Sequence, residues 1–231
     1  MSVRQKASRG RPRTTDPTHV LDVAMTEYWL GDPADVSLNS ICVRAGVSKP
    51  SLYREFGSED GLARSALDRY AEQVLSRVLG ILQADIGLRA TLDALVEFAC
   101  DDPRMETGCL FYKMRAGKRH WGPLTRARVD ELDAGARGAY ARFLEHCRDA
   151  GEWPAERSVQ VGARYLLEQM GLAIAQRASG ENVRDVRETM RLALSVIESA
   201  ATAPQGHASG SADRRKAPAR SRTTLATDER R

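Results

Sequence analysis

The segment GVSKPSLYREF, residues 46–56, contains polar side chains of two chemical kinds at close spacing. They are short hydroxyls and long side chains with polar tips: Ser48, Lys49, Ser51, Tyr53 and Arg54. If Val47 and Leu52 face a core, helical spacing turns these polar side chains outward together. Such groups contact phosphates and the base edges exposed in a nucleic-acid groove. The segment therefore has the chemistry of a surface that contacts a polyanion.

The other reactive side chains form no pattern that predicts catalysis or metal binding. The histidines are His19, His120, His146 and His207, and the cysteines are Cys42, Cys100, Cys109 and Cys147. No C-x-x-C pair, phosphate loop, dinucleotide fingerprint or Ser-His-Asp order is found. A thiol switch between Cys109 and Cys147 is an alternative to the simpler interpretation of cysteines as small core residues. We expect no enzyme activity, no metal site and no cofactor.

Short helices with recognisable ends must position residues 46–56. Asp16-Pro17 begins a first amphipathic helix, because Asp can cap a helix and Pro suits its first position. Ser37 caps a second helix, which ends at Gly46, a residue that readily adopts positive φ. Ser48 then caps a third helix. Two helices joined by so tight a turn form a helix-turn-helix, whose second helix presents the polar residues.

The rest of the chain has helical periodicity and no strand alternation. A fourth helix begins after Ser58, and its apolar stripe extends to Leu82. Further helical segments are predicted over residues 88–100, 107–114, 124–149, 155–178 and 183–200. We predict an all-α fold in four parts: a disordered basic arm (1–15), a helix-turn-helix domain (16–62), a helical C-terminal domain (63–202) and a disordered basic tail (203–231).

Positive charge is concentrated at the two ends of the sequence. The formal net charge is only +4 over 231 residues, which is weak evidence for a nucleic-acid partner. Five cations precede the first helix: Arg4, Lys6, Arg9, Arg11 and Arg13. We interpret this arm as a polyanion contact and the basic C-terminal tail as solvated. The first thirty residues lack the apolar core of a signal peptide, and no apolar run reaches membrane length, so we expect a cytoplasmic protein with reduced thiols and no membrane association.

The stretch SLNSICVRAGVSKPSLYREFGSEDGL, residues 37–62, resembles the signature of the TetR family of bacterial transcriptional regulators. The resemblance covers about residues 10–65; beyond them only the number and order of helices agree, although GCLF at residues 108–111 resembles a frequent start of the family's sixth helix. It implies an all-α homodimer whose two third helices contact the half-sites of a palindromic operator in double-stranded DNA. It also implies a C-terminal domain that dimerises and binds a small-molecule effector.

The resemblance assigns DNA contacts to individual residues: Ser37, Ser48, Lys49, Ser51, Tyr53 and Arg54. In the family, Tyr53 would meet a phosphate. The chain departs from the family where a lysine often follows the cap residue, because Glu59 and Asp60 follow Ser58 here. Two carboxylates cannot help to bind a phosphate, so that contact is not carried over. The RGRPR sequence of the arm, with Arg11 and Arg13, resembles an arm that enters the minor groove and could compensate.

Apolar and aromatic residues gather on the middle helices: Phe98, Cys109, Phe111, Tyr112, Met114, Trp121, Phe143, Cys147, Tyr165, Leu166 and Met170. Each one alone is more simply a core residue. As a set, some should line an effector pocket, because pockets in helical bundles form between helices. Trp121 is interpreted either as the pocket mouth or as loop packing.

Two apolar stripes on the last helices are predicted to form a four-helix dimer interface. Their residues are Val159, Ala163, Leu166, Met170 and Ile174, followed by Val186, Met190, Leu194 and Ile197. Gly171 lies among them and would let two copies approach closely. The alternative is packing within one chain. Together these features predict a ligand-responsive DNA-binding repressor; the alternative function is a helical protein-interaction module that no longer reads DNA.

Overall fold

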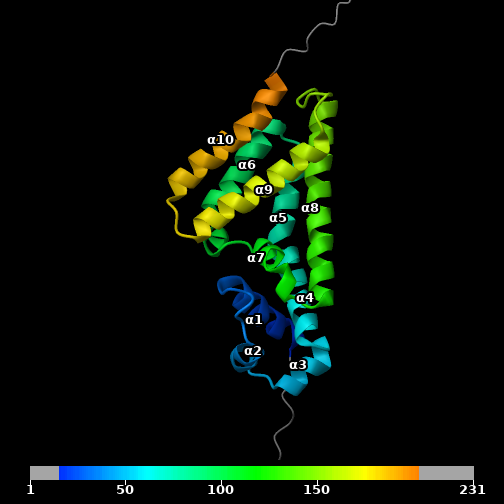
Figure 1. Ribbon diagram of the computed structural model, residues 1–231, viewed down its shortest axis with the longest axis vertical. Coiled ribbons are helices and arrows are strands. Elements are labelled where there is room, and N and C mark those ends of the chain that lie inside the picture. The colour runs from blue at the N-terminus through cyan, green and yellow to red at the C-terminus, as the bar shows by residue number, and fades with distance from the viewer. Residues whose placement is uncertain (1–15, 203–231) are drawn as a thin grey trace, which may run out of the picture.

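The computed structural model describes residues 16–202, with side chains as far as Glu198 (Figure 1). Its α-helices are α1 (Pro17–Leu30), α2 (Leu38–Ala45), α3 (Lys49–Phe56), α4 (Glu59–Tyr70), α5 (Ser76–Leu82), α6 (Leu88–Asp101), α7 (Leu110–Ala116), α8 (Pro123–Asp149), α9 (Val159–Ala178) and α10 (Val183–Thr202). A π-helical segment, η1 (Ala71–Leu75), and two 3₁₀ turns, η2 (Pro103–Thr107) and η3 (Lys118–His120), complete them. Residues 16–202 contain no strand, which confirms the predicted all-α fold.

Helices α1, α2 and α3 lie together at one end of the molecule with the first turns of α4 (Figure 1). The predicted caps are present: the Asp16 side chain accepts a hydrogen bond from Thr18 N at 3.0 Å, and Ser37 Oγ accepts one from Ser40 N at 3.1 Å. Gly46 ends α2 at φ 65°, in the left-handed region. The buried Leu52 anchors α3. These local signals produce the predicted helix-turn-helix.

The predicted fourth helix is interrupted by η1. Its apolar stripe is buried at Leu62, Leu67 and Val74, but the π-helical segment changes the helical register between α4 and α5. The predicted domain boundary between residues 62 and 63 falls inside α4. The two parts of the chain therefore share this helix, and any movement of α4 affects both.

The C-terminal part is arranged along the long helix α8 (Figure 1). Helix α8 packs against α4, α5, α7 and α9, while α10 packs against α6 and α9. Leu95, Leu144 and Leu166 are among its fully buried side chains. Within residues 16–202, every helix is too short or too polar to cross a membrane.

Candidate nucleic-acid interface and internal cavity

Helix α3 presents the predicted polar side chains at the surface. Lys49 and Arg54 are exposed, and no carboxylate among the described residues forms an ion pair with either. Tyr53 is 41% exposed. The neighbouring cation Arg44 is instead bound to Glu27 at 3.1 Å and ties α2 to α1. The exposed side of α3 thus combines two cations with a phenol.

The predicted serines combine exposure with a structural role. Ser37 and Ser48 cap α2 and α3. Ser48 Oγ accepts a hydrogen bond from Ser51 N at 3.3 Å and donates one to Ser51 Oγ at 3.1 Å. Capping places these hydroxyls at helix N-termini, where backbone N–H groups also favour anions. The predicted contacts Arg11 and Arg13, the basic arm and the C-terminal tail lie outside the described residues.

The two acidic residues that depart from the family pattern make different contacts. Tyr53 Oη donates to Glu59 Oε1 at 3.2 Å. Desolvation, followed by this hydrogen bond and the Glu59 charge, raises the pKa of Tyr53. The exposed Glu59 therefore orients the phenol, but it also adds negative charge where a phosphate would approach.

Asp60 caps the N-terminus of α8 from another helix. Its carboxylate accepts hydrogen bonds from Leu124 N at 2.8 Å and Thr125 N at 3.1 Å, and Thr125 Oγ1 donates to the Asp60 carbonyl at 3.0 Å. Burial alone would raise the pKa of the Asp60 carboxyl, but these hydrogen bonds and the charge of Arg126 lower it below its ordinary value. A Cβ at Gly122 would lie 2.3 Å from Asp60 Cγ. The glycine therefore permits this junction between α4 and α8.

A second junction joins α7 to the helix-turn-helix part. Lys113 Nζ donates to the carbonyl oxygens of Trp29 at 2.6 Å and Gly31 at 3.1 Å, at the end of α1. Trp29 Nε1 donates to the Gly108 carbonyl at 2.6 Å, and the indole packs edge-on against Tyr70 with 4.9 Å between ring centroids. Burial lowers the pKa of Lys113. Hydrogen bonds and packing thus connect α1 directly to the start of α7.

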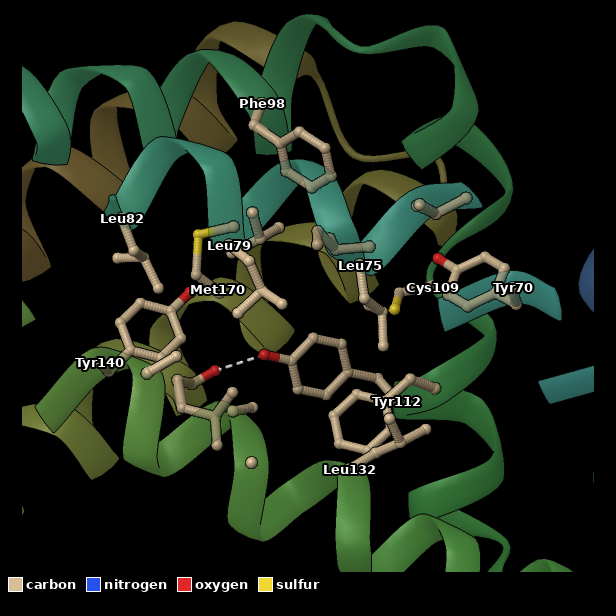
Figure 2. A pocket seen from close by; sticks show the side chains of 18 of the residues that line it. Tyr70, Leu75, Leu79, Leu82, Phe98, Cys109, Tyr112, Leu132, Tyr140 and Met170 are labelled. Atoms are coloured by element: carbon tan, nitrogen blue, oxygen red, sulfur yellow. Dashed lines mark hydrogen bonds between the residues drawn. The ribbon is translucent and has the colours of Figure 1, made fainter. Parts of the chain in front are cut away.

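An internal cavity of about 350 Å³ lies beside these junctions (Figure 2). It is lined by α4, η1, α5, α6, α7, α8 and α9 and opens to solvent at its α5 and α8 edge, where Leu79 and Arg142 are exposed. Five predicted pocket residues line it: Phe98, Cys109, Phe111, Tyr112 and Met170. Its volume lies within the range of small-molecule sites. About half of the residues predicted for the pocket therefore line this one cavity.

The other predicted pocket residues lie elsewhere. Met114 is completely buried in the core. Trp121 packs edge-on against Tyr28 at 5.9 Å and borders a surface depression beside α1. Phe143 and Cys147 line a neighbouring groove between α5, α6 and α8, and Tyr165 donates to the Ala193 carbonyl at 2.8 Å between α9 and α10. Trp121 thus belongs to loop packing rather than to the cavity mouth.

Sequence reasoning missed two tyrosines of the cavity. Tyr70 and Tyr140 line it together with leucines of η1 and α5. A signal was present in the sequence for both: Tyr70 belongs to the apolar stripe of the fourth helix, and Tyr140 precedes Phe143 by one helical turn.

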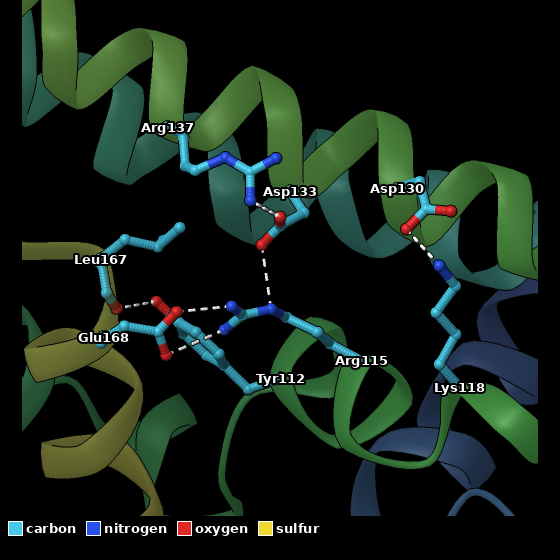
Figure 3. Close-up of polar contacts among 8 residues, drawn as sticks. All are labelled: Tyr112, Arg115, Lys118, Asp130, Asp133, Arg137, Leu167 and Glu168. Carbon is cyan, nitrogen blue, oxygen red and sulfur yellow. Dashed lines mark hydrogen bonds and ion pairs between the residues drawn. The ribbon is translucent and has the colours of Figure 1, made fainter. Parts of the chain in front are cut away.

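Ion pairs connect α7 with α8 and α9 next to the cavity (Figure 3). Arg115 Nε lies 2.9 Å from Asp133 Oδ1, and its guanidinium also binds Glu168. Asp133, buried on α8, pairs with Arg137 as well. Tyr112 Oη donates to the Leu167 carbonyl at 2.7 Å. Helix α7 is thus bound to both walls of the cavity.

The predicted dimer stripes are wrong as an exposed interface. All of their residues are buried within the chain: Val159, Ala163, Leu166, Met170, Ile174, Val186, Met190, Leu194 and Ile197. Gly171 also faces the interior, because a Cβ there would lie 2.7 Å from Tyr112 Cε1. An amphipathic helix turns its most apolar side to its own core first, so the alternative of packing within one chain holds for these residues.

All four cysteines are buried and form no disulfide. Burial raises the pKa of Cys42, Cys100 and Cys109, and raises that of Cys147 to about 12. Because the thiolate is the reactive form, these four thiols have the properties of small core residues. Residues 16–202 contain no group of three or more His, Cys, Asp or Glu side chains arranged to hold a metal ion.

Comparisons with known proteins agree with this architecture. The model of the family described as bacterial regulatory proteins, tetR family, matches residues 20–66, from α1 into α4. The HTH-type transcriptional repressor ComR of Escherichia coli (strain K12) is 38% identical over 72 residues, 31% of this chain and 34% of that protein. The HTH-type transcriptional regulator AlkX of Mycobacterium tuberculosis (strain ATCC 25618 / H37Rv) is 30% identical over 82 residues, 36% and 37% of the two chains. The matches therefore span about a third of these relatives.

Similarity to solved structures extends over most of the chain. The reduced form of E. coli NemR superposes with a TM-score of 0.67 at 19% identity, over 79% of this chain and 95% of that one. A cysteine mutant of the TetR family transcriptional regulator CifR, complexed with 26-bp double-strand operator DNA, superposes with a TM-score of 0.64 at 25% identity, over 80% and 98%. ComR, AlkX and CifR are thus described as transcriptional regulators. The helix-turn-helix part thus matches the tetR family in sequence, and the fold of most of the chain is similar to that of TetR family regulators.

Proposed function

We propose that this protein is a transcriptional repressor that binds a palindromic operator as a homodimer and responds to a small-molecule effector. The observation that carries the proposal is helix α3, which presents Lys49, Tyr53 and Arg54 at the exposed end of a helix-turn-helix. Such side chains suit phosphates and base edges in the major groove. The operator-bound structure of the relative CifR supports DNA as the partner. A repressor of this kind acts in the cytoplasm, where bacterial DNA lies.

We place the dimer interface on the outer side of α9 and α10. Four large apolar side chains are exposed there: Val161 at 69%, Leu172 at 49%, Leu192 at 74% and Val196 at 53%. Residues 161 and 172 are about three helical turns apart, and residues 192 and 196 about one, so each pair shares a side of its helix. The hydrogen bond from Tyr165 to the Ala193 carbonyl holds the two helices side by side. Large apolar residues that stay exposed on two adjacent helices favour a protein partner, here a second copy.

We place the effector in the cavity between α5 and α8. Its wall residues Tyr70 and Cys109 adjoin the contacts of Trp29 with Tyr70 and Gly108. Occupancy of the cavity can therefore shift α7 or α4 and so change the position of α3 relative to the dimer axis. In this scheme the two junctions, at Asp60 and at Lys113, couple effector binding to DNA binding.

Fluorescence anisotropy with labelled duplexes from the region upstream of the gene tests this function. Lys49→Ala and Arg54→Ala should each weaken binding by about 1–3 kcal/mol per half-site while the circular dichroism spectrum stays unchanged. Arg148→Ala is the matched control, because Arg148 is exposed at the far end of α8. The wild type should prefer one duplex over scrambled DNA and lose affinity steeply with salt. Binding that is equally weak for every duplex would favour the helical protein-interaction module.

A further inference from the structure

The cavity proposed for the effector has walls made almost entirely of carbon. Leu75, Leu79 and Leu82 form one side, with Phe98 above them and Met170 beside them (Figure 2). A ligand that fills this space loses its water and gains apolar contacts. Its body must therefore be largely apolar.

Charged side chains reach only the α8 edge of the cavity. There the Arg128 guanidinium is bound to Asp68 and, at 3.0 Å, to Glu131, so it is not free to neutralise a ligand. Arg142 is exposed to solvent. An ionised group placed between Leu79 and Tyr140 would be desolvated without a partner, which is strongly unfavourable. Away from the α8 edge, where Arg128 and Arg142 lie, the walls therefore disfavour an ionised group.

Away from the α8 edge, three phenols, which are not equivalent, provide the hydroxyl groups of the cavity. Tyr112 Oη is already bonded to the Leu167 carbonyl. Tyr70 Oη is buried beside Cys109 and has no hydrogen bond of ordinary geometry to any described residue. Tyr140 is only 2% exposed, its hydroxyl points to the interior, and none of the hydrogen bonds among residues 16–202 involves it (Figure 2).

The Tyr140 hydroxyl can donate a hydrogen bond to a ligand acceptor, and it carries no negative charge that would attract a cation. Burial raises the pKa of its phenol well above the ordinary value, so the hydroxyl keeps its proton at neutral pH. Tyr140 Oη is not among the fully buried unpaired atoms of residues 16–202, which include Tyr70 Oη. The Tyr140 hydroxyl therefore remains open to the cavity, where a ligand acceptor can reach it. Burial likewise keeps the Cys109 thiol protonated, so it does not favour covalent capture.

We infer that the effector is a neutral, predominantly apolar molecule with one hydrogen-bond acceptor, held non-covalently, and that the acceptor is bound by Tyr140. This inference specifies the ligand class of the proposed function. It rests on that function, because only a regulator makes the ligand an effector. Tyr140 and Tyr70 lie at opposite ends of the cavity in Figure 2, with leucines between them. A molecule with two linked rings and a carbonyl matches this arrangement of an extended apolar space with a donor at one side.

Isothermal titration calorimetry on the full-length protein without DNA tests the inference with three related probes. Benzophenone has a carbonyl acceptor, diphenylmethane has the same rings without an acceptor, and 4-benzoylbenzoate adds a negative charge. We expect benzophenone to bind about three- to tenfold more tightly than diphenylmethane, as one hydrogen bond predicts. We expect 4-benzoylbenzoate to bind more weakly than either neutral probe.

Two phenylalanine variants locate the acceptor site. Tyr140→Phe removes one oxygen and should abolish the preference for benzophenone while leaving diphenylmethane affinity unchanged. Tyr165→Phe is the matched control, because the Tyr165 hydroxyl binds Ala193 outside the cavity, and the preference should persist there. An undiminished preference in Tyr140→Phe, tightest binding of the anion, or no binding of either neutral probe would overturn the inference.

These outcomes are separate from those that test the regulator. Operator binding is measured without any probe, and probe binding is measured without DNA. A protein that binds the probes as expected but binds no operator would refute the proposed function and leave the chemistry of the cavity intact. Normal operator binding with an undiminished benzophenone preference in Tyr140→Phe would refute only the ligand class.

Discussion

At the scale of single residues, Glu59 and Asp60 show why adjacent carboxylates need separate explanations. Glu59 is exposed and accepts a hydrogen bond from Tyr53 Oη. Asp60 is partly buried and accepts hydrogen bonds from two backbone amides of α8. The first carboxylate lies at the proposed DNA surface, and the second stabilises the fold. Only Glu59 therefore represents a direct electrostatic cost to DNA binding.

We predict that Glu59→Gln strengthens operator binding. Removing a negative charge next to the Tyr53 hydroxyl lowers repulsion of the phosphate that Tyr53 would meet, by about 1 kcal/mol per half-site at low salt. Anisotropy titrations of the labelled operator measure the change. Glu156→Gln is the control, because it makes the same charge change on the exposed loop between α8 and α9. Equal affinities of wild type and Glu59→Gln would show that no phosphate approaches Tyr53.

At the scale of elements, the helix-turn-helix part is attached through contacts that complete helix ends. Asp60 of α4 caps α8, and Lys113 of α7 binds the last carbonyls of α1. Helix ends expose backbone groups that need partners. Because each partner comes from a different helix, a displacement of α4 or α7 leaves backbone groups unpaired. These junctions therefore resist small displacements and favour discrete positions of the DNA-binding part.

We predict that Asp60→Ala lowers the free energy of unfolding by about 0.5–2 kcal/mol, the range for a lost N-cap. The loss should exceed that in Asp16→Ala, where a single cap contact to Thr18 N is removed. Urea denaturation at several pH values measures both. Since the folded-state pKa of Asp60 is lowered, its contribution is present above about pH 4 and declines as the pH falls through that lowered pKa. A difference from wild type that grows on acidification would contradict the cap.

We predict that Lys113→Met destabilises the protein by about 1–3 kcal/mol, because the carbonyls of Trp29 and Gly31 lose their donor in a partly buried place. Methionine retains much of the apolar stem, so packing changes little. Lys118→Met is the matched control nearby, since Lys118 pairs with Asp130 at the surface (Figure 3) and should cost under about 1 kcal/mol. Thermal unfolding of the three proteins gives the comparison, and equal midpoints of the two variants would remove Lys113 as a junction residue.

At the scale of the whole molecule, the ends of the first helices could be predicted from the sequence. The way each helix is rotated against its neighbours could not. Ser37, Gly46 and Ser48 each act on the backbone within a few residues, so the helix-turn-helix follows from the sequence. Whether an aromatic residue faces the cavity depends on how helices rotate against one another. Phe98 and Tyr112 therefore line the cavity, whereas Tyr165, on an equally apolar helix, lies between α9 and α10.

Because the sequence does not show how the helices are oriented, it also did not show what the apolar stripes of α9 and α10 pack against. A stripe of apolar residues indicates burial without indicating whether the partner is the same chain or another copy. The stripe containing Leu166 packs inside the chain, and Gly171 makes room for Tyr112 rather than for a second copy. What distinguishes a surface for another copy is the smaller set of large apolar residues that stays exposed after folding.

We predict that Leu192→Glu converts the proposed dimer to a monomer. Leu192 is 74% exposed on α10, so a charge there leaves the fold of each chain intact but would be buried when two copies meet. Size-exclusion chromatography with light scattering should show half the wild-type mass. Operator affinity should fall by about a hundredfold or more, because binding of the second half-site is no longer intramolecular.

Ile86→Glu is the control for this prediction, because Ile86 is 50% exposed in the turn between α5 and α6, outside α9 and α10. It should remain dimeric and bind the operator normally. Gly171→Leu, by contrast, should unfold more readily than wild type, because its side chain meets the Tyr112 ring. If Leu192→Glu stays dimeric while a well-folded Gly171→Leu dissociates, the interface lies on the inner stripe side of α9 and the assignment to the outer side is wrong.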